Sequence, residues 1–290
     1  MADGVKPLAI DREEPGAGGG KSLKGKMRLA VLVYRINLVG PEVAIFRFKP
    51  KEGEVFPFKA GQYATLALEV DGRFIARAYS ITSSPYTRDY LEFYINVIKE
   101  GQLTPALFDL RHGDEVYYMG PKGVFTVERT KARHILLVAT GTGLAPYISM
   151  LRKLHADQHL GRPHGRVITL LHGVRHSEDL GYREEIEALS YDKEFNLLYL
   201  PIVSRTGEDP LWTPALGKGR ITDLLQLIRE KRPDREIQTL PYGLDPQTVF
   251  QRFPRHDAAV YLCGNPDMTA EARQILTEKG YQEIYTEDYW

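Results

Sequence analysis

The stretch LLVATGTGLAPYISML, from Leu136 to Leu151, decides the fold of this chain. It begins as a short apolar run typical of a buried strand, passes through a glycine-rich turn and continues as the start of a helix. Gly141 and Gly143 allow close approach of the backbone, and the free N–H groups at the helix start face outward. The pattern predicts a cradle for a phosphate. Pro146 replaces the third glycine of the full dinucleotide fingerprint, so an ordinary strand-to-helix turn remains an alternative.

On the C-terminal side of this stretch, strand and helix patterns alternate. The strands are HILLVAT, VITLLHGV, NLLYLPIV and AAVYLCG. We expect helices over 145–159, 182–190, 221–230 and 269–279. Alternating βα units form parallel sheets covered on both faces. Residues 129–290 are therefore predicted to be a Rossmann-like α/β domain.

On the N-terminal side, residues 27–128 consist of short strands separated by turn signals such as VGPE, KAGQ and EVDGR. This spacing predicts an antiparallel β-barrel. Residues 1–26 contain GAGGG and scattered charges with no apolar period, so we expect a disordered leader. The fold class is thus a β-barrel followed by a parallel α/β domain.

Composition limits the function. The 290 residues suit two domains, and 38 basic residues balance 38 acidic ones, which gives no global attraction to nucleic acid or an anionic membrane. The single cysteine, Cys263, excludes an internal disulfide and a four-cysteine iron–sulfur cluster. His172 and His176 lack the companions of a metal site. No apolar run approaches the roughly 20 residues that span a bilayer, and the start lacks a secretory signal. We expect a cytoplasmic monomer that binds no metal.

Four motifs occur in the order of a known family: RAYS at 77–80, GTGLAPYISM at 141–150, YLCGNPDM at 261–268 and EDYW at 287–290. Together they resemble the ferredoxin–NADP reductases, and most of all the bacterial subclass that reduces ferredoxin or flavodoxin and ends in an aromatic pair. The resemblance covers about Leu29 to Trp290. It implies FAD on the barrel, NADP(H) on the second domain and hydride transfer between them.

The resemblance assigns the first motif to the flavin. Arg77 would pair with the pyrophosphate, Tyr79 would stack on the isoalloxazine and Ser80 would hydrogen-bond its N5 atom. Alternate strand residues share a face, so Arg77 and Tyr79 should point the same way, and Ser80 should point the other way or into a bend. Thr104 and Pro105 would also suit the N-cap and first residue of a helix. The further FAD residues implied are Ala78, Ile95, Asn96, Val97, Gln102, Leu103, Thr104, Thr142, Tyr289 and Trp290.

Arginines after successive strands suggest a site for the 2′-phosphate of NADP(H), since NAD-specific sites usually carry an acidic residue there. Arg175 and Arg205 follow two successive strands and Arg220 precedes a helix, so we expect a preference for NADPH over NADH. Each arginine could instead be a solvated surface charge. The NADP(H) residues implied are Gly141, Thr142, Gly143, Val174, Arg175, Ser204, Arg205, Arg220, Cys263 and Gly264.

The residues expected at the reaction centre are Ser80, Cys263, Glu287 and Tyr289. Cys263 is expected to position the nicotinamide. Tyr289 would stack on the flavin face opposite Tyr79 and move aside for the nicotinamide, and Trp290 would extend towards the FAD adenine. Glu287 would handle a proton or help to place the nicotinamide.

The partner implied is ferredoxin or flavodoxin, bound transiently. Acidic carriers prefer a basic face. The stretch from Lys21 to Lys51, which includes the end of the leader, contains eight basic residues and one acidic residue, Glu42. The basic residues are Lys21, Lys24, Lys26, Arg28, Arg35, Arg47, Lys49 and Lys51. The alternatives are an NADH-dependent reductase component of an oxygenase or haem system, a non-enzymatic FAD redox sensor, and a structural protein without flavin. The segment 207–219 is expected to reshape the adenosine pocket.

Overall fold

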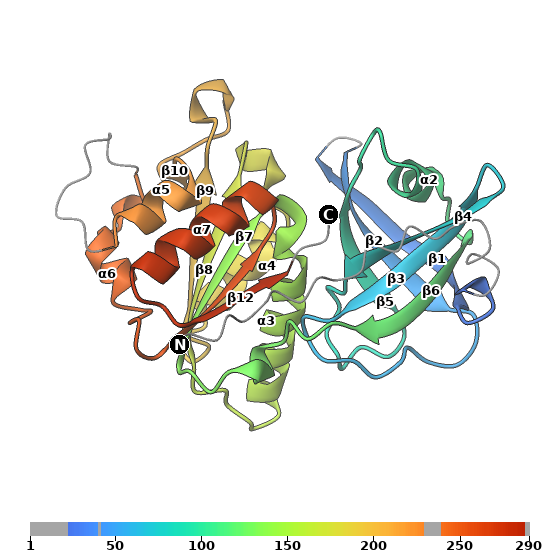
Figure 1. Ribbon diagram of the computed structural model, residues 1–290, viewed down its shortest axis with the longest axis horizontal. Coiled ribbons are helices and arrows are strands. Elements are labelled where there is room, and N and C mark those ends of the chain that lie inside the picture. The colour runs from blue at the N-terminus through green and yellow to red at the C-terminus, as the bar shows by residue number, and fades with distance from the viewer. Residues whose placement is uncertain (1–22, 40–41, 229–238, 288–290) are drawn as a thin grey trace, which may run out of the picture.

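The computed structural model describes residues 23–39, 42–228 and 239–287, which form two domains side by side (Figure 1). The first is a barrel-like sheet, and the second is a parallel sheet flanked by helices, as the sequence predicts. The chain passes from one to the other at the 3₁₀ turn η1. The elements of the first part are β1 (Arg28–Val39), β2 (Val43–Pro50), β3 (Tyr63–Val70), β4 (Arg73–Ser80), β5 (Leu91–Asn96), α2 (Leu103–Asp109), β6 (Glu115–Lys122) and η1 (Val127–Arg129).

The barrel strands pair in the order β4-β3-β6-β1-β2-β5, all antiparallel. A bridge between Ile81 and Phe93 joins the two outer strands. Strand β2 shows how the sequence sets the two faces, because alternate side chains point to opposite sides. Ala44, Phe46 and Phe48 are buried inside the barrel, whereas Ile45 faces the second domain.

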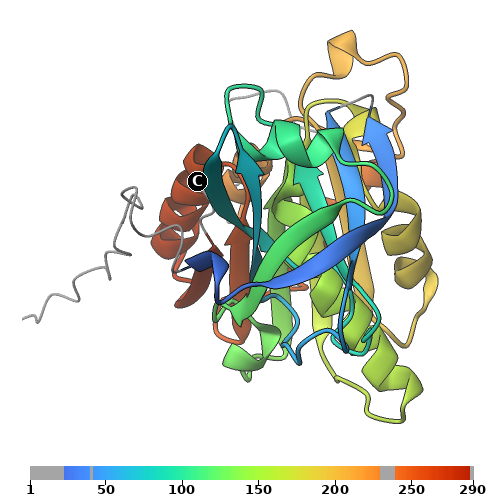
Figure 2. The same ribbon diagram turned by 90° about the vertical axis from the view of Figure 1, so that its right-hand side faces the viewer.

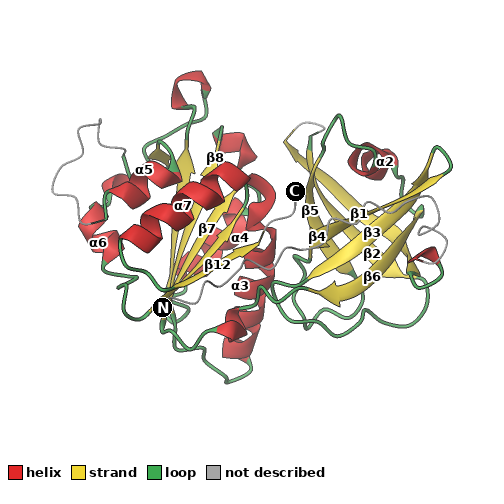
Figure 3. Cartoon of the chain, in the orientation of Figure 1, coloured by secondary structure: helices red, strands yellow, loops and turns green. Residues whose placement is uncertain are grey.

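The second domain has six parallel strands in the order β10-β9-β8-β7-β11-β12. Figure 3 shows helices on both sides of this sheet. Its strands are β7 (His134–Thr140), β8 (Val167–Val174), β9 (Leu197–Val203), β10 (Gly217–Lys218), β11 (Ala258–Cys263) and β12 (Glu283–Glu287). Its helices are α3 (Ala145–His159), α4 (Arg183–Tyr191), α5 (Ile221–Gln226), α6 (Pro246–Phe250) and α7 (Pro266–Glu278), and its 3₁₀ turns are η2 (Gly141–Leu144), η3 (Ser177–Asp179), η4 (Thr206–Glu208) and η5 (Pro241–Gly243).

Strand β7 explains why helices cover both faces of this sheet. Ile135 and Leu137 pack with residues of α3 and α4, whereas Leu136 and Val138 pack with residues of α5 and α7. A strand that is apolar on both faces can bury itself only between two helical layers. The phosphate-turn stretch therefore lies at the centre of the domain.

The barrel packs against the α3 side of the sheet (Figure 1), and Figure 2 shows the molecule with the barrel towards the viewer. Ile45, Tyr94 and Phe125 of the first part belong to the same apolar cluster as α3. Gly181 permits this contact, because a Cβ atom there would lie 2.3 Å from the Tyr94 hydroxyl. The two domains thus share a core.

Most expected elements are confirmed, including the short antiparallel strands of the barrel and α3 with its bounds. Helix α7 begins at Pro266, three residues before the expected start, because the Asn265 side chain accepts hydrogen bonds from Asp267 N and Met268 N. Strand β12 and helix α6 were not expected. Residues 23–26, expected within a disordered leader, form a helical turn in which Lys24 pairs with Glu69. The rest of that leader lies outside the described residues.

Candidate functional site

The RAYS motif occupies the end of β4, an outer strand of the barrel. Tyr79 lies opposite Ala64 and Ser80 lies opposite Tyr63 on β3, so Tyr79 and Ser80 point to opposite faces, as expected. Tyr79 is partly buried and packs on the barrel core, and burial raises the pKa of its phenol. Ser80 is buried.

The Arg77 guanidinium is exposed on the face that Tyr79 also shares. Its hydrogen bond within the described part of the chain goes to the carbonyl of the adjacent Ala76, at 2.8 Å. Within that part it pairs with no carboxylate. An exposed, uncompensated guanidinium beside a half-buried tyrosine fits a phosphate group and a flat ring, which are the two parts of FAD that this motif is expected to hold.

The other expected FAD residues lie at the end of β5 and in α2. Ile95 and Leu103 are buried core residues, whereas Asn96 and Gln102 are exposed. The expectation that Thr104 caps α2 is wrong, because the N-cap is Gln102. The Thr104 hydroxyl instead accepts a hydrogen bond from Ile98 N and donates one to Ile98 O. Val97 is half-buried after the strand end.

The glycine turn after β7 lies against the turn after β11. A Cβ atom on Gly143 would lie 2.5 Å from Cys263 O, and one on Gly264 would lie 2.2 Å from Thr140 Oγ1. These two glycines are therefore required by backbone packing. Gly141 has a φ of +53° and nothing within 4 Å of an added Cβ, so its turn is open to a ligand, with Thr142 half-buried beside it. An open turn at the end of a parallel strand fits a phosphate.

A continuous set of contacts connects Ser80 of the barrel with Cys263 of the second domain. Ser80 is the partner of Tyr63 across β3 and β4. A Cβ atom on Gly123 would lie 2.9 Å from the Tyr63 ring and 3.9 Å from Glu287 Oε1, which places both side chains at the same spot. Glu287 in turn lies opposite Cys263 across β11 and β12. Burial and then the charge of Glu287 raise the pKa of Tyr63.

Sequence reasoning missed Tyr63 and Gly123. The available signal for Tyr63 was its position in QYATLALEV, the strand that precedes RAYS across a tight turn. Cys263 is fully buried in the shared core, where it packs as a small apolar side chain. Tyr289 and Trp290 lie outside the described residues.

The proposed phosphate-binding arginines lie after neighbouring strands. Arg205 N donates to Arg175 O at 3.0 Å, and Ser204 donates to Val174 O from both N and Oγ. Arg220 follows β10, which pairs with β9. All three guanidinium groups belong to exposed residues. The segment 207–219 packs beside them through Trp212 and Leu216, next to Val174 and Val203.

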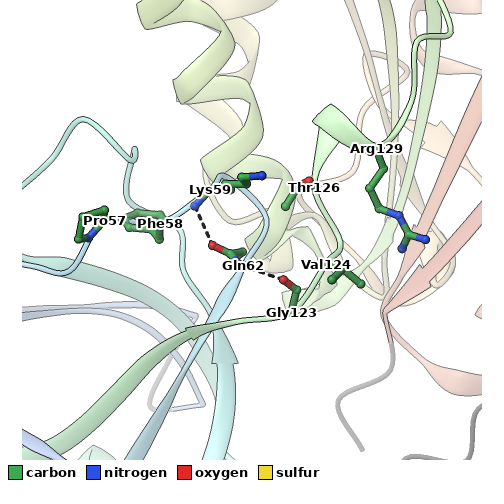
Figure 4. Close-up of a pocket in the computed structure, with 8 residues that line it drawn as sticks. All are labelled: Pro57, Phe58, Lys59, Gln62, Gly123, Val124, Thr126 and Arg129. Atoms are coloured by element: carbon green, nitrogen blue, oxygen red, sulfur yellow. Dashed lines mark hydrogen bonds between the residues drawn. The ribbon is translucent and has the colours of Figure 1, made fainter.

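A cavity of about 500 Å³ opens at the junction of the two domains (Figure 4). Gln62 crosses it, accepting a hydrogen bond from Lys59 N and donating one to Gly123 O. Through Gly123 this cavity adjoins the contact between Tyr63 and Glu287. Its lining residues are Pro57, Phe58, Lys59, Gln62, Gly123, Val124, Thr126 and Arg129.

Three of the seven described cations of the expected basic docking face form ion pairs within the chain. Lys24, Arg47 and Lys51 form ion pairs with Glu69, Glu92 and Glu115, which come from other strands. Arg28 and Arg35 donate to backbone carbonyls. The local charge count in the sequence overlooked these partners because they are distant along the chain. Lys21 lies outside the described residues.

Within 23–39, 42–228 and 239–287, no helix has the length and apolar character to cross a bilayer. In the same ranges, no group of three or more His, Cys, Asp or Glu side chains is arranged to hold a metal ion.

Comparisons with known proteins identify the family of the chain. The chain matches the oxidoreductase FAD-binding domain over residues 30–127 and the oxidoreductase NAD-binding domain over residues 137–274. It is 32% identical over 245 residues to a ferredoxin–NADP reductase of Pseudomonas aeruginosa, covering 81% of this chain and 84% of that protein. It is 33% identical over 252 residues to NADH-cytochrome b5 reductase 1 of Laccaria bicolor, covering 84% and 71%.

The crystal structure of a ferredoxin NADP⁺ reductase from Neisseria gonorrhoeae with bound FAD and NADP is similar in fold. Its TM-score is 0.73 at 24% identity, and the alignment covers 91% of this chain and 99% of that chain.

Proposed function

Because the chain belongs to the ferredoxin–NADP reductase family, we propose that it transfers electrons between NADP(H) and ferredoxin or flavodoxin through bound FAD. The observation that carries the proposal is the set of contacts from Ser80 through Tyr63 and Glu287 to Cys263. It joins the flavin motif of one domain to the nicotinamide motif of the other. FAD supplies the exchange between hydride transfer at N5 and single-electron transfer to the carrier.

The chain's own residues orient the two cofactors. Arg77 would bind the FAD pyrophosphate, Tyr79 would cover one face of the flavin, and Ser80 would hydrogen-bond N5. Gly141 and its neighbours would hold the NADP(H) pyrophosphate, and Cys263 with Gly264 would support the nicotinamide. Binding the two rings in near contact is the main catalytic contribution that such a site can make. The further FAD contacts proposed are the exposed Asn96 and Gln102 and the backbone around Ile95, Val97, Leu103, Thr104 and Thr142.

Glu287 would hold or move a proton at the junction, beside the Tyr63 phenol. Tyr289 and Trp290 would cover the flavin and give way to the nicotinamide, so deleting both residues should tighten binding of NADP⁺ and weaken the preference for NADPH. Difference absorption titrations measure both effects. Unchanged affinity and preference would remove the gating role from the proposal.

Specificity for NADPH is proposed to come from Arg175, Ser204, Arg205 and Arg220. The visible absorption spectrum of the purified protein tests the function directly. It is recorded anaerobically before and after addition of NADPH, with NADH in parallel. Flavin bands that bleach quickly with NADPH and slowly with NADH are expected. A protein that stays colourless after FAD is supplied would overturn the proposal.

A second candidate function is that of an NADH-dependent reductase for a haem protein. The similarity to NADH-cytochrome b5 reductase 1 favours it. It predicts faster bleaching with NADH and electron transfer to a cytochrome in preference to ferredoxin or flavodoxin. A cytoplasmic location and a monomeric state remain predictions, and size-exclusion chromatography with light scattering checks the latter.

A further inference from the structure

The segment that follows RAYS runs along helix α3 of the other domain. Ser149 Oγ donates to Ser83 O at 2.8 Å, and Arg152 Nη1 donates to Thr82 O at 3.0 Å. Further along, the Tyr86 hydroxyl donates to Asp157 Oδ1 at 2.6 Å. Strand β4, which carries RAYS, is therefore followed directly by the segment that contacts the second domain.

Arg152 is at the centre of this contact. Its Nε and Nη2 atoms donate to the two carboxylate oxygens of Glu185, at 2.6 and 2.7 Å, in a bidentate pair within the α/β domain. Its remaining Nη1 atom donates to Glu92 Oε1 of barrel strand β5 at 2.6 Å. One guanidinium thus binds a carboxylate from each domain.

The Glu92 carboxylate also binds donors other than Arg152. Its side chain is 1% exposed, and Oε2 accepts from Arg47 Nε at 2.7 Å. Oε1 also accepts from the hydroxyl of Tyr182, on the second domain, and from that of Thr82. A buried carboxylate with so many fixed donors has few other positions available, because moving it would leave charges unpaired away from water.

The position of this pair along the chain gives it a functional consequence. Thr82 is two residues beyond Ser80, where the flavin is proposed to bind. Helix α3 begins directly after the phosphate turn Gly141–Leu144, and Arg152 follows its first two turns. Only a short length of backbone therefore separates this contact from each of the two proposed cofactor sites.

We propose that Arg152 is a positioning residue that sets the distance between the flavin and nicotinamide sites by fixing the barrel against α3. The proposal rests on the proposed hydride transfer. A misplacement of about 1 Å between reacting groups can lower a rate on the order of 100-fold. Loss of Arg152 should therefore slow flavin reduction while each domain keeps its own cofactor affinity.

The main variant is Arg152→Met, with Arg152→Lys as the conservative change. Arg183→Met is the matched control, because Arg183 pairs with Glu187 within helix α4. FAD content, the affinity for NADP⁺ from difference spectra, and the single-turnover rate of flavin reduction by NADPH are measured for each. Arg152→Met should reduce its flavin about 10- to 100-fold more slowly, with FAD content and NADP⁺ affinity near those of the parent. Arg152→Lys should be intermediate and Arg183→Met unchanged.

A reduction rate in Arg152→Met equal to that of the parent would overturn the proposal. So would a loss of FAD or NADP⁺ binding that accounts for the whole rate change. If Arg152→Met does not fold, the double variant Glu92→Gln, Arg152→Met avoids a buried unpaired carboxylate and should show the same slow reduction.

Amide hydrogen exchange, measured without added NADP(H), gives a readout that does not depend on activity. Arg152→Met should exchange faster than the parent over Thr82–Tyr86 and along α3, and Arg183→Met should not. Equal exchange in Arg152→Met and the parent would count against the fixed contact. A parent protein that binds FAD but is not reduced by NADPH would remove the proposed function, whereas the exchange result would still decide whether Arg152 fixes the domains.

Discussion

Cys263 and Glu287 are direct partners in the parallel ladder between β11 and β12. This pairing carries the Glu287 carboxylate to the junction of the domains, where it meets the Tyr63 ring beside Gly123. The short strand β12 therefore places an acid next to the nicotinamide motif of one domain and the flavin motif of the other.

Replacing Glu287 by Gln removes a charge from this junction without changing the shape of the side chain. We expect flavin reduction or turnover to slow by roughly 100-fold, within the range for loss of a proton-transfer group, and the KM for NADPH to change little. The pKa of Tyr63 should also fall, because a negative neighbour raises it now. Stopped-flow kinetics and ultraviolet titration measure these effects, with Glu278→Gln on α7 as control. An unchanged rate would exclude Glu287 from the reaction.

Gly264 is predicted to tolerate no side chain. Its φ is +136°, and a Cβ atom would meet Thr140 Oγ1 at 2.2 Å and Thr140 N at 2.8 Å. Gly264→Ala should cost about 1–3 kcal/mol of unfolding free energy and weaken NADP⁺ binding, because the two turns must separate. Gly207→Ala is the matched control, since nothing lies within 4 Å of an added Cβ there. Equal denaturation midpoints for the two variants would contradict the prediction.

The exposed arginines after β9 and β10 should discriminate between the two nucleotides. Arg205→Gln or Arg220→Gln should raise the KM for NADPH by roughly 10- to 100-fold, the effect of losing a charged hydrogen bond, and leave that for NADH nearly unchanged. Arg111→Gln, on an exposed loop of the barrel, serves as control. Steady-state kinetics with both nucleotides make the comparison. An equal loss for NADPH and NADH would show that these arginines do not read the 2′-phosphate.

Glu92 should make stability depend on pH. Burial alone would raise the pKa of this carboxyl, but the Arg152 guanidinium and the hydrogen bonds to it keep the pKa below the usual 4.5. A lowered folded-state pKa means that the stabilisation is present above pH 4.5 and is lost as pH falls through the folded value. Glu92→Gln should therefore be less stable at neutral pH by about 1–3 kcal/mol, with the difference shrinking in acid. Urea unfolding across this range measures it, and a difference independent of pH would contradict the prediction.

His172 is fully buried on β8, with Nδ1 3.2 Å from the Tyr199 hydroxyl. Burial, only partly opposed by the backbone of Gly141, lowers the pKa of its imidazole to about 4. The neutral ring therefore supports the folded state above pH 6.5, and this support is lost as pH falls towards 4 because the unfolded chain takes up the proton first. NMR titration, with His172→Gln to assign the resonance, should show a neutral ring at pH 6. A charged ring at that pH would mean that water reaches the site.

Local patterns predicted the elements well where propensity and packing agree. The turn-separated short strands before residue 128 and the apolar run before TGTG each match a single kind of element, and both were confirmed. Strand β12 was missed because EIYTE is short and only half-buried, so its pattern is weak without its partner β11. The prediction that Thr104 caps α2 was wrong because the Thr104 hydroxyl hydrogen-bonds to the backbone of Ile98, in the preceding loop.

The sequence by itself determined the order of the two domains, the glycine turn and the identity of the motifs, because these depend on neighbours along the chain. Only the tertiary structure decided which side chains meet across the chain. It paired Lys24, Arg47 and Lys51 with distant carboxylates, placed Tyr63 beside Glu287, and set Arg152 between Glu92 and Glu185. Such contacts depend on strand register and on how the barrel packs against α3, and neither is encoded in any short stretch of residues.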